Sequence, residues 1–345
     1  MQGSPPSSCD PLSSQTHHAP TIFYFADTCY TFVGVFPSWN PAQPEITDLI
    51  VPYDPQTLAR LPVRKTEVLK TFAAFHNRQA MQAIQNLPER NGLLDEPAID
   101  RLMLIVHSEM QRLAEEFYHG HRVAELLRVM IATLRRSGFA GQLRVVDIGC
   151  GIGYTIRWLA AHSALPAENI ELAGVDLNGA LISEANRLTC IENLPCRFFH
   201  GDAFSPACSG DIFLSTGVIH HFRDAALFNF LRRHEQTRVQ AFLHYDFQPW
   251  LLAPFGAWFF HFLRMRTAVA KHDGVLSAAR AHSGAALVAA SRHAAPAFTS
   301  GIYGAKIWDT PVPRVFHALV GIRRELSSAL RAQLGRRLRR LPEFA

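Results

Sequence analysis

Alternating glycines follow a short run of β-forming residues near the middle of the chain. Residues 145–154 read VVDIGCGIGY, with Gly149, Gly151 and Gly153 after the apolar run and Asp147 just before its end. Glycine adopts backbone angles that other residues avoid, and it lets a ligand approach bare backbone. A merely tight turn needs one glycine, so three glycines beside an acid predict a turn that binds a ligand through its backbone.

The spacing separates the ligand classes that use such a turn. A P-loop ends in Gly-Lys-Ser/Thr, whereas Gly153 is followed here by Tyr154 and Thr155. A dinucleotide site needs a small residue at position 154, where this chain has the bulky Tyr154. The spacing therefore excludes a P-loop and disfavours a dinucleotide-dependent oxidoreductase.

Further groups able to do chemistry stand after later apolar runs. Asp176 and Asp202 each follow one such run, His220 and His221 follow a third, and a His-Tyr-Asp triplet occupies 244–246. Ligands of open α/β sheets bind where the strands end. An imidazole titrates near neutrality and can take the proton of a hydroxyl group. His220 and His221 are therefore the predicted catalytic residues, with 244–246 as further candidates.

The hydrophobic pattern around these residues predicts strands that alternate with helices. Strands are expected at 143–148, 170–175, 196–199, 212–215 and 239–245, helices at 154–162, 179–190, 223–234 and 284–293, and two late strands at 303–308 and 314–320. The adjacent Val145 and Val146 indicate a strand that is covered on both faces. The expected fold class is α/β: a Rossmann-like, mostly parallel seven-stranded sheet with helices on both faces.

Composition and pattern divide the chain into four parts. Residues 1–20 are rich in Pro, Ser and His and are expected to be a disordered tail. Residues 21–138 are predicted to form a mixed, mainly helical N-terminal cap. The sheet belongs to residues 139–323, and residues 324–345 form a basic C-terminal tail.

The cap is expected to be irregular or short-stranded over 21–60 and helical over 64–76 and 96–134. Asp95 fits the start of the second helix, because an aspartate accepts hydrogen bonds from the free N–H groups there. Ser137-Gly138 fits the end of that helix.

The order of these features resembles class I S-adenosylmethionine-dependent methyltransferases, well over residues 125–250 and loosely to 323. Asp147-x-Gly149-x-Gly151-x-Gly153 is similar to the first motif of that family. Residues 211–222, which read DIFLSTGVIHHF, are similar to the fourth-strand motif of its quinone-biosynthesis branch. The resemblance implies S-adenosylmethionine as the cofactor.

The resemblance also implies roles for single residues. Asp176 would hold both ribose hydroxyls, Asp202 would contact the adenine amino group, and Asp147 would orient the glycine turn near the amino-acid end of the cofactor. A carboxylate suits a vicinal diol because its two oxygens accept both hydroxyl protons. The other implied cofactor contacts are Gly149, Cys150, Gly151, Gly153, Leu177, Ala203 and Thr216.

The favoured function is methyl transfer to a small, aromatic or apolar acceptor in secondary metabolism, with O-methylation favoured over N- or C-methylation. The alternatives are an RNA or protein methyltransferase and a non-catalytic cofactor-binding scaffold. Residues 211–222 do not resemble the N/D-P-P-Y motif of enzymes that methylate amino groups of nucleic acids. The intact glycines and Asp176 argue against a scaffold.

The charge of the chain is concentrated near its C-terminus. The formal net charge is +5, yet residues 323–340 hold seven arginines and one acid, Glu325. The remainder is about neutral, so no nucleic-acid partner is expected. Leucines recur among these arginines at near-helical spacing, at positions 330, 334, 338 and 341. This pattern favours a solvated helix end, with contact to an acidic membrane surface as an alternative and RNA as a third.

Cysteines, histidines and apolar runs bound the remaining functions. The six cysteines contain no C-x-x-C pair, which fits a reducing cytoplasm. His119 and His121 lack the i, i+4 spacing of metal ligands on a helix, so no metal is expected. The first twenty residues do not resemble a signal peptide. The apolar run from Trp250 to Leu263 is too short for a bilayer span and predicts a buried helix or a cavity wall.

Overall fold

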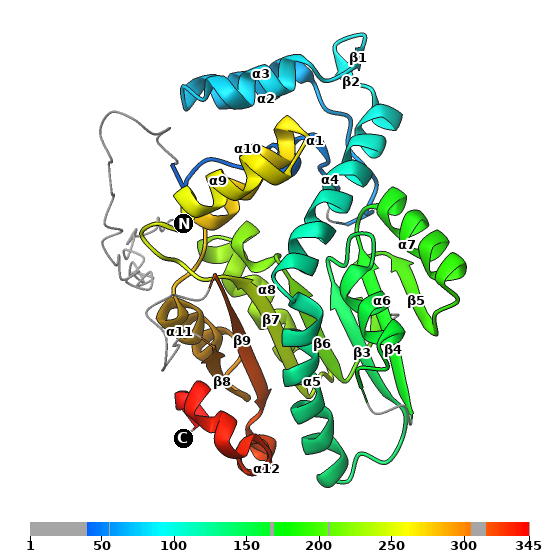
Figure 1. Cartoon of the computed structure of the whole chain (residues 1–345), viewed down its shortest axis with the longest axis vertical. Coiled ribbons are helices and arrows are strands. Elements are labelled where there is room, and N and C mark those ends of the chain that lie inside the picture. The colour runs from blue at the N-terminus through cyan, green and yellow to red at the C-terminus, as the bar shows by residue number, and fades with distance from the viewer. Residues whose placement is uncertain (1–39, 55, 166–168, 206–207, 305–314, 345) are drawn as a thin grey trace, which may run out of the picture. The chain divides into compact units, whose positions relative to one another are not determined.

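The computed structural model describes residues 40–54, 56–165, 169–205, 208–304 and 315–344, so the expectations for 1–20 and 21–39 lie outside it. Its centre is a seven-stranded sheet in the order β5-β4-β3-β6-β7-β9-β8 (Figure 1). The strands are β3 (Leu143–Ile148), β4 (Ile170–Asp176), β5 (Cys196–His200), β6 (Ile212–Thr216), β7 (Ala241–Phe247), β8 (Phe298–Tyr303) and β9 (Phe316–Arg323). Strands β3 to β7 pair in parallel, and β9 is antiparallel to both of its neighbours. The predicted mostly parallel, seven-stranded sheet is confirmed.

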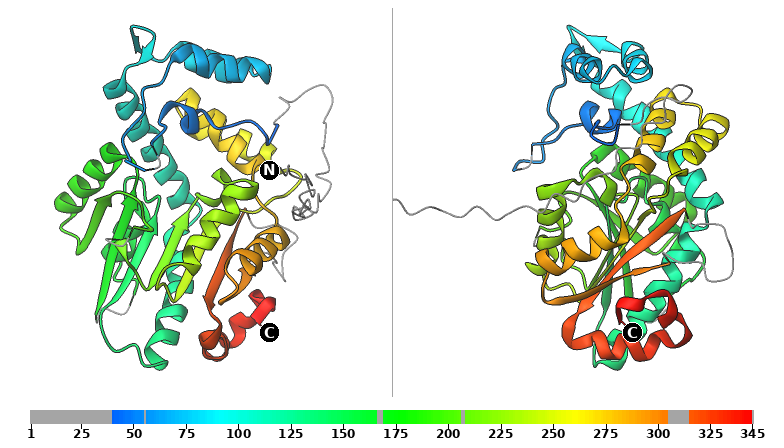
Figure 2. Two further views of the ribbon diagram at one scale, coloured as in Figure 1. Left: turned by 180° about the vertical axis from the view of Figure 1, so that it is seen from behind. Right: turned by 90° about the vertical axis from the view of Figure 1, so that its left-hand side faces the viewer.

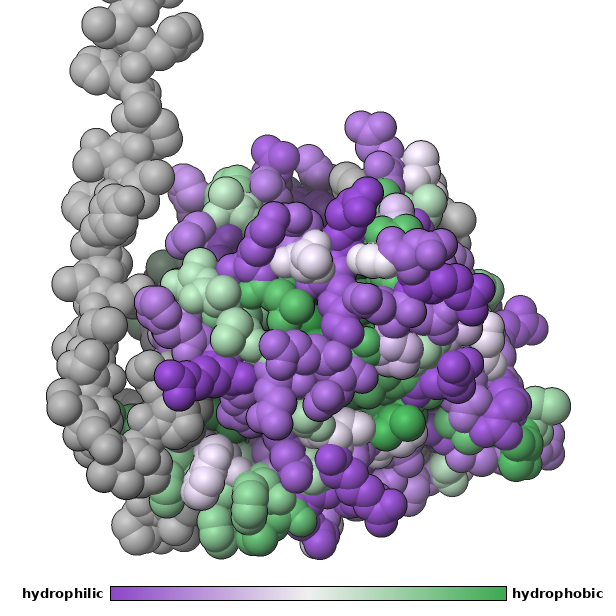
Figure 3. All heavy atoms as spheres, turned by 90° about the horizontal axis from the view of Figure 1, so that it is seen from above, coloured by the Kyte–Doolittle hydropathy of each residue, from purple (hydrophilic) through white to green (hydrophobic). Residues whose placement is uncertain are grey.

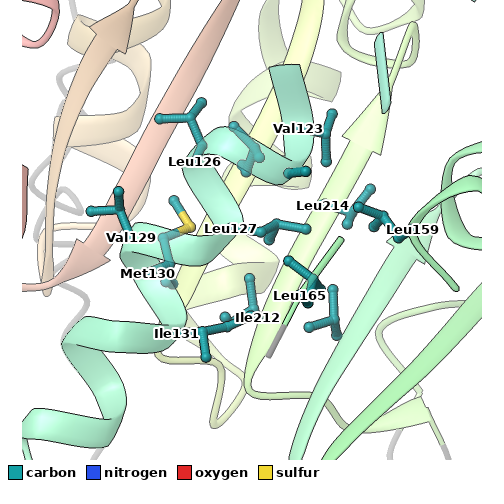
Figure 4. Packing of buried hydrophobic residues seen from close by; sticks show 14 of the residues in the cluster. Val123, Leu126, Leu127, Val129, Met130, Ile131, Leu159, Leu165, Ile212 and Leu214 are labelled. Carbon is teal, nitrogen blue, oxygen red and sulfur yellow. The ribbon is translucent and has the colours of Figure 1, made fainter. Parts of the chain in front are cut away.

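Helices cover both faces of this sheet (Figure 2). They are α5 (His119–Arg136), α6 (Tyr154–Ala161), α7 (Gly179–Glu192), α8 (Asp224–Glu235), α11 (Gly284–Ala294) and α12 (Ser327–Leu334). Val145 packs in a cluster with residues of α5, α6 and α12, and Val146 packs in another with residues of α8 and α11. Figure 4 shows α5 presenting Val123, Leu127 and Ile131 to this core. Successive strand residues point to opposite faces, so the unalternating apolar run of β3 fills two cores.

The two late strands differ from the prediction. A strand was expected at 303–308, but β8 ends at Tyr303, and residues 305–314 lie outside the described chain. Strand β8 contains the pair Ser300-Gly301, and glycine is depleted in strands, so the β-forming pattern is interrupted and the strand is hidden in the sequence. Strand β9 begins at Phe316, two residues later than expected. The five earlier strands end within two residues of their predicted bounds.

The helical pattern over 96–134 belongs to two helices. Helix α4 (Glu96–Glu116) ends before Phe117, and α5 starts after Tyr118, whose φ of 57° is left-handed. The new direction brings Gly120 against α6, where a Cβ at position 120 would lie 2.2 Å from Cδ2 of Trp158. Apolar periodicity continues across this break, so the sequence did not reveal it. Asp95 accepts a hydrogen bond from Ala98 N–H at 3.3 Å, as expected of an N-cap.

The cap combines two distant parts of the chain. Its first part contains α1 (Ile46–Ile50), α2 (Lys65–Ala74), α3 (Arg78–Gln85), the short hairpin β1 (Glu89–Arg90) and β2 (Leu93–Leu94), and α4. Its second part is α9 (Ala253–Arg264) and α10 (Ala268–Ala279), which follow β7. Both parts share one core, in which Val269 and Ala270 join Ile46, Phe72 and Ile99. The predicted cap over 21–138 therefore left out α9 and α10.

The C-terminal tail is part of the packed domain. Helix α12 contacts α5, and Leu330, Leu334 and Leu341 are buried in the same cluster as the sheet. The predicted boundary at 323/324 therefore does not mark the end of the core. Because these three leucines are buried in the core of the domain, they do not form an exposed apolar face that could contact a membrane.

Helix α9 contradicts the prediction of a buried helix or cavity wall. His261 is its only buried residue, and several of its aromatic side chains are exposed. Among the described residues, no helix is long and apolar enough to cross a bilayer.

Candidate active site

A cavity of about 650 Å³ lies where β3, β4 and β6 end, beneath the cap. Its lining comes from the turn after β3 (149–152), the end of β4 (176–178), the end of β6 (216–218), the 3-10 turn Ile219–His221, and α1, α4 and α10 of the cap. Small-molecule sites have volumes in this range. The carboxyl ends of neighbouring parallel strands meet here, as expected for an open α/β sheet.

The glycine turn forms one wall of the cavity as bare backbone. Gly149, Gly151 and Gly153 have φ values of +66°, +56° and +77°, which other residues seldom adopt. A Cβ at position 151 would also lie 2.4 Å from Nδ1 of His107. The turn is held in place by Val175, whose carbonyl accepts from the N–H groups of Gly149 and Cys150 at 2.8 and 3.2 Å. This surface therefore fits a ligand that lies directly on backbone.

Asp176 closes the turn from the end of β4. Its Oδ2 accepts from Gly151 N–H at 2.9 Å, and its Oδ1 accepts from Asn178 N–H at 2.8 Å. A carboxylate has about four acceptor positions, so these two bonds leave capacity for hydroxyl groups in the cavity. Asp176 lines that cavity beside Leu177.

Asp147 supports the turn from behind and does not line the cavity. It is buried, and its Oδ1 has no hydrogen-bond partner among the described residues. Burial, with a smaller contribution from the charge of Asp176, raises the pKa of the Asp147 carboxyl well above its usual range. Burial therefore favours the uncharged form of this carboxyl group.

His220 stands at the other end of the cavity in a hydrogen-bonded pair with Asp246. Its Nδ1 lies 2.8 Å from Asp246 Oδ1, and its backbone N–H donates to Asp246 Oδ2 at 3.0 Å. Burial alone would raise the pKa of Asp246, but the charge and hydrogen bonds of His220 lower it below its usual range. When the imidazole is uncharged and donates from Nδ1 to this carboxylate, Nε2, which lies 3.5 Å from Glu45 Oε1, can accept a proton.

His221 has a different electrostatic environment. Its Nδ1 lies 2.8 Å from Asp48 Oδ1 and 3.8 Å from Glu45 Oε2. Burial would lower the pKa of His221, but these two carboxylates outweigh it and raise the pKa to about 9. His221 is therefore charged at neutral pH and cannot accept a proton. The adjacent histidines, which the sequence left equivalent, have different carboxylate partners at Nδ1: Asp246 for His220 and Asp48 for His221.

Polar groups of α10 and of Arg280, the residue that follows it, hold the segment that carries these two carboxylates. Arg280 Nη1 lies 2.9 Å from Asp48 Oδ2, and Ser277 Oγ donates to Glu45 Oε1 at 3.0 Å. Asp273 Oδ1 accepts from the backbone N–H of Ile46 at 2.8 Å. The two parts of the cap are therefore joined by hydrogen bonds and ion pairs directly beside His221.

Comparison with known proteins identifies the central part of the chain. Residues 145–237 match a family model described as a methyltransferase domain. The chain carries a class I methyltransferase domain. This class takes its methyl group from S-adenosylmethionine, and the predictions of the family, the enzyme class and the cofactor are confirmed. No curated protein gives a significant match to the sequence.

Solved structures of low sequence identity resemble parts of the methyltransferase. One is the plantazolicin methyltransferase BpumL, solved with a desmethyl substrate analogue and S-adenosylhomocysteine (12% identity, 66% of this chain and 97% of that chain, TM-score 0.44). Another is the magnesium protoporphyrin IX methyltransferase of Synechocystis (16%, 75% and 99%, TM-score 0.40). A third is a putative O-methyltransferase of Nostoc punctiforme (20%, 57% and 55%, TM-score 0.37).

The methyltransferase brings some predicted cofactor residues to the cavity and leaves others outside it. The lining includes Gly149, Cys150, Gly151, Asp176, Leu177 and Thr216. It does not include Asp147, Gly153, Asp202 or Ala203. The Oδ1 of Asp202 accepts from Phe204 N–H at 3.0 Å, and its Oδ2 pairs with Arg233. In this structure Asp202 therefore caps the following turn, and its predicted adenine contact stays a prediction.

Other histidines have structural environments. His244 Nδ1 lies 2.9 Å from Ser215 Oγ, and its Nε2 lies 3.1 Å from His234 Nε2. Burial lowers the pKa of His244 well below its usual range, and the residue does not line the cavity. His119 does line the cavity, where burial lowers its pKa to about 4. Neither histidine replaces His220 as the candidate base.

The cluster around His220 has the spacing of a metal site. Glu45, His220 and His221 each offer one atom within 4.8 Å of the others. The Nδ1 atoms of both histidines already contact carboxylates, and the Arg280 guanidinium lies 3.7 Å from Glu45 Oε1. These ion pairs and hydrogen bonds account for the arrangement, so we assign no metal to it. The expectation of no metal stays a prediction.

Sequence analysis missed Glu45 and Asp48. Both come from a segment that was described only as irregular, and they reach the site through contacts with residues more than 220 positions away. A signal existed on the other side of the contact, where Asp273, Ser277 and Arg280 recur at roughly helical spacing. That spacing indicates one polar helix face but does not identify its partner.

Proposed function

We propose that this methyltransferase moves a methyl group from S-adenosylmethionine to a hydroxyl group of a small aromatic or apolar acceptor. The observation that carries the proposal is the His220–Asp246 pair: Asp246 holds Nδ1 of the imidazole, while Nε2 lies 3.5 Å from Glu45 Oε1 among the residues that line the cavity. A base is needed when the acceptor must lose a proton, as a phenol or alcohol must. An amine acceptor that is already neutral needs no such group.

The cavity offers separate regions for the cofactor and the acceptor. The backbone of Gly149 and Gly151, with the Asp176 carboxylate, would hold the cofactor, whose sulfonium supplies an electrophilic methyl group. Apolar side chains of α4, β7 and β9 line the remaining wall, among them Met103, Met110, Leu113, Phe247 and Phe316. Apolar walls with a few convergent polar groups favour an apolar acceptor that carries one reactive group.

The proton of the acceptor hydroxyl passes to Nε2 of His220. The resulting imidazolium donates from Nδ1 to Asp246, whose buried carboxylate stabilises the charge. Orientation of the acceptor oxygen supplies much of the remaining rate, because well-aligned reactants gain about 7–11 kcal/mol. His221 stays protonated and anchors the Glu45–Asp48 segment beside the base.

The test begins by identifying the acceptor. The enzyme is incubated with a metabolite extract and S-adenosylmethionine that carries an isotopically labelled methyl group, and the product is located by mass spectrometry. Single-turnover rates are then compared for wild type, His220→Ala and His221→Ala. The His220→Ala rate should fall by about 10²–10⁴-fold, with unchanged S-adenosylhomocysteine affinity. Label on nitrogen or carbon, or a wild-type rate for His220→Ala on a hydroxyl acceptor, refutes the proposal.

A further inference from the structure

Large hydrophobic side chains are exposed over one short stretch of the cap. Half of the large hydrophobic residues that are exposed in the described chain lie between positions 250 and 263. They are Trp250, Leu251, Leu252, Phe255, Phe259, Phe262 and Leu263, with exposed fractions from 41% to 60%. Seen from the cap side, hydrophobic residues gather in patches among hydrophilic ones (Figure 3). Contiguous exposed apolar residues mark interaction sites.

Helix α9 turns its apolar side outward. At about 100° per residue, Phe259, Phe262 and Leu263 fall on one side of the helix, and all three are exposed. His261 falls on the opposite side and packs against α10, where a Cβ at Gly274 would lie 1.8 Å from its ring. An ordinary surface helix shows the reverse pattern, with polar residues outward. Packing among the residues that the structure describes therefore does not explain why Phe259, Phe262 and Leu263 face outward.

The charged residues of this helix and of the segment that follows it in the sequence have one sign. Residues 247–272 contain no aspartate or glutamate, and their cationic side chains are Arg264, Arg266 and Lys271. Lys271 Nζ lies 5.6 Å from the centre of the Phe262 ring, which places a cation at the edge of the apolar surface. Arg264 pairs with Glu116, whereas Arg266 contacts Glu109 through its backbone N–H. An apolar surface with a cationic edge complements an anionic partner.

We propose that α9 binds the surface of an anionic lipid membrane, with its phenylalanines at the boundary between headgroups and acyl chains. Helices that lie in this interface combine Trp, Phe and Leu on one side with Lys and Arg beside them. Each cation near an anionic leaflet adds to the attraction. A second copy of the chain fits less well, because a twofold contact would place the same cations opposite themselves.

The position of α9 gives this surface a role in acceptor supply. Helix α10 packs against α9, and its residues Ala270, Gly274 and Ser277 line the cavity. The lipid surface would therefore lie one helix away from the acceptor site, where an apolar acceptor dissolved in the membrane is concentrated. Membrane binding itself does not depend on the acceptor or on the base, so its test is independent of the proposed reaction.

The test is co-sedimentation of the full chain with vesicles of phosphatidylcholine, with or without phosphatidylglycerol. Wild type should sediment with the anionic vesicles and less with the neutral ones. The Phe259→Glu/Phe262→Glu variant should bind at least ~10-fold more weakly, because the loss of two buried methylenes already costs about that much. Ile191→Glu is the matched control, since Ile191 is 67% exposed on α7, and it should bind as wild type does.

A second variant keeps the apolar surface intact. Arg266→Gln should weaken binding to anionic vesicles by ~5-fold, the effect of about one charge, and leave binding to neutral vesicles unchanged. Calorimetry with S-adenosylhomocysteine checks that every variant is folded. Equal sedimentation of wild type and the double glutamate variant overturns the proposal. So does a wild-type dimer in light scattering that the double variant disrupts, without vesicle binding.

Discussion

The charged state of His221 predicts a pH-dependent contribution to stability. The pKa of His221 is about 9 in the folded protein and near 6.5 in an unfolded chain. Because the folded pKa is the higher one, the stabilisation is fully present below about pH 6.5 and is lost as the pH rises through 9. Burial lowers this pKa most strongly and Arg280 lowers it further, but Glu45 and Asp48 raise it by more.

The size of the effect follows from the same values. A shift of about 2.5 pKa units corresponds to about 3 kcal/mol at about 1.36 kcal/mol per unit. The His221 side chain is 32% exposed, so solvent screening reduces the expected contribution to about 2 kcal/mol. The substitution His221→Gln removes the charge and keeps a side chain of similar size.

The assay is denaturant unfolding of wild type and His221→Gln at about pH 6 and about pH 9.5. The variant should be less stable by about 2 kcal/mol at the lower pH, and the difference should nearly vanish at the higher pH. His293→Gln, on the exposed end of α11, is the control for the general effect of a His-to-Gln substitution on unfolding. A constant difference between wild type and His221→Gln at both pH values refutes the charged-state argument.

Further outcomes follow from other parts of the structure. Asp176→Ala should weaken S-adenosylhomocysteine binding by ~1.5–3 kcal/mol in calorimetry. Asp202→Ala should weaken it by at most ~1 kcal/mol, because Arg233 already pairs with the Asp202 carboxylate. Equal losses for the two variants contradict the assignment of Asp176 as the cofactor-binding carboxylate. Leu334→Ala should destabilise the protein by ~2–5 kcal/mol in denaturant unfolding, since this leucine is 2% exposed, whereas an exposed tail would show no change. Gly274→Ala should destabilise the protein by ~1–3 kcal/mol, because the added Cβ would overlap the His261 ring. Gly256→Ala in α9 should stabilise the protein by up to ~1 kcal/mol, because the added Cβ meets no atom within 4 Å. Melting temperatures of the two variants that shift in the same direction contradict this contrast. A metal chelator should leave turnover unchanged, and loss that is restored by a divalent ion would reassign Glu45, His220 and His221 as ligands.

Most of the sheet could be predicted because its strands are local patterns. The run that contains Val145 and Val146 is apolar on both faces, and the glycines after it require positive φ. These properties depend on neighbours in the sequence, so periodicity and turn chemistry capture them. Strand β8 was not predicted because the pair Ser300-Gly301 resembles a loop, although pairing with β9 makes these residues part of a strand.

The different roles of His220 and His221 could not be predicted, because they depend on carboxylates that are distant in the sequence. Asp246, the partner of His220, is 26 positions away, and Asp48, the partner of His221, is 173 positions away. The imidazoles are adjacent and chemically identical in the sequence. Only the arrangement of the carboxylates around them makes one a candidate base and the other a cation.

The composition of α9 was misinterpreted for a related reason. Hydrophobicity predicts that a segment is removed from water, but it does not show whether the segment packs in the core of its own chain or against another surface. The run from Trp250 to Leu263 was therefore assigned to the core, whereas the structure exposes it. Periodicity alone cannot distinguish an inward from an outward apolar side.

The joining of the cap across the chain sets an order of events during synthesis. Ile46 and Thr47 bond to Asp273, which leaves the ribosome 227 and 226 residues after them. At translation rates of about 5–20 residues per second, the first part of the cap waits roughly 10–50 s for this partner. The hydrogen bonds that join the two parts of the cap over the cavity therefore cannot form until the parallel strands β3 to β7 have emerged. Before Asp273 has emerged, the nascent chain contains the glycine turn that would hold the cofactor, but the cavity beneath the cap is incomplete.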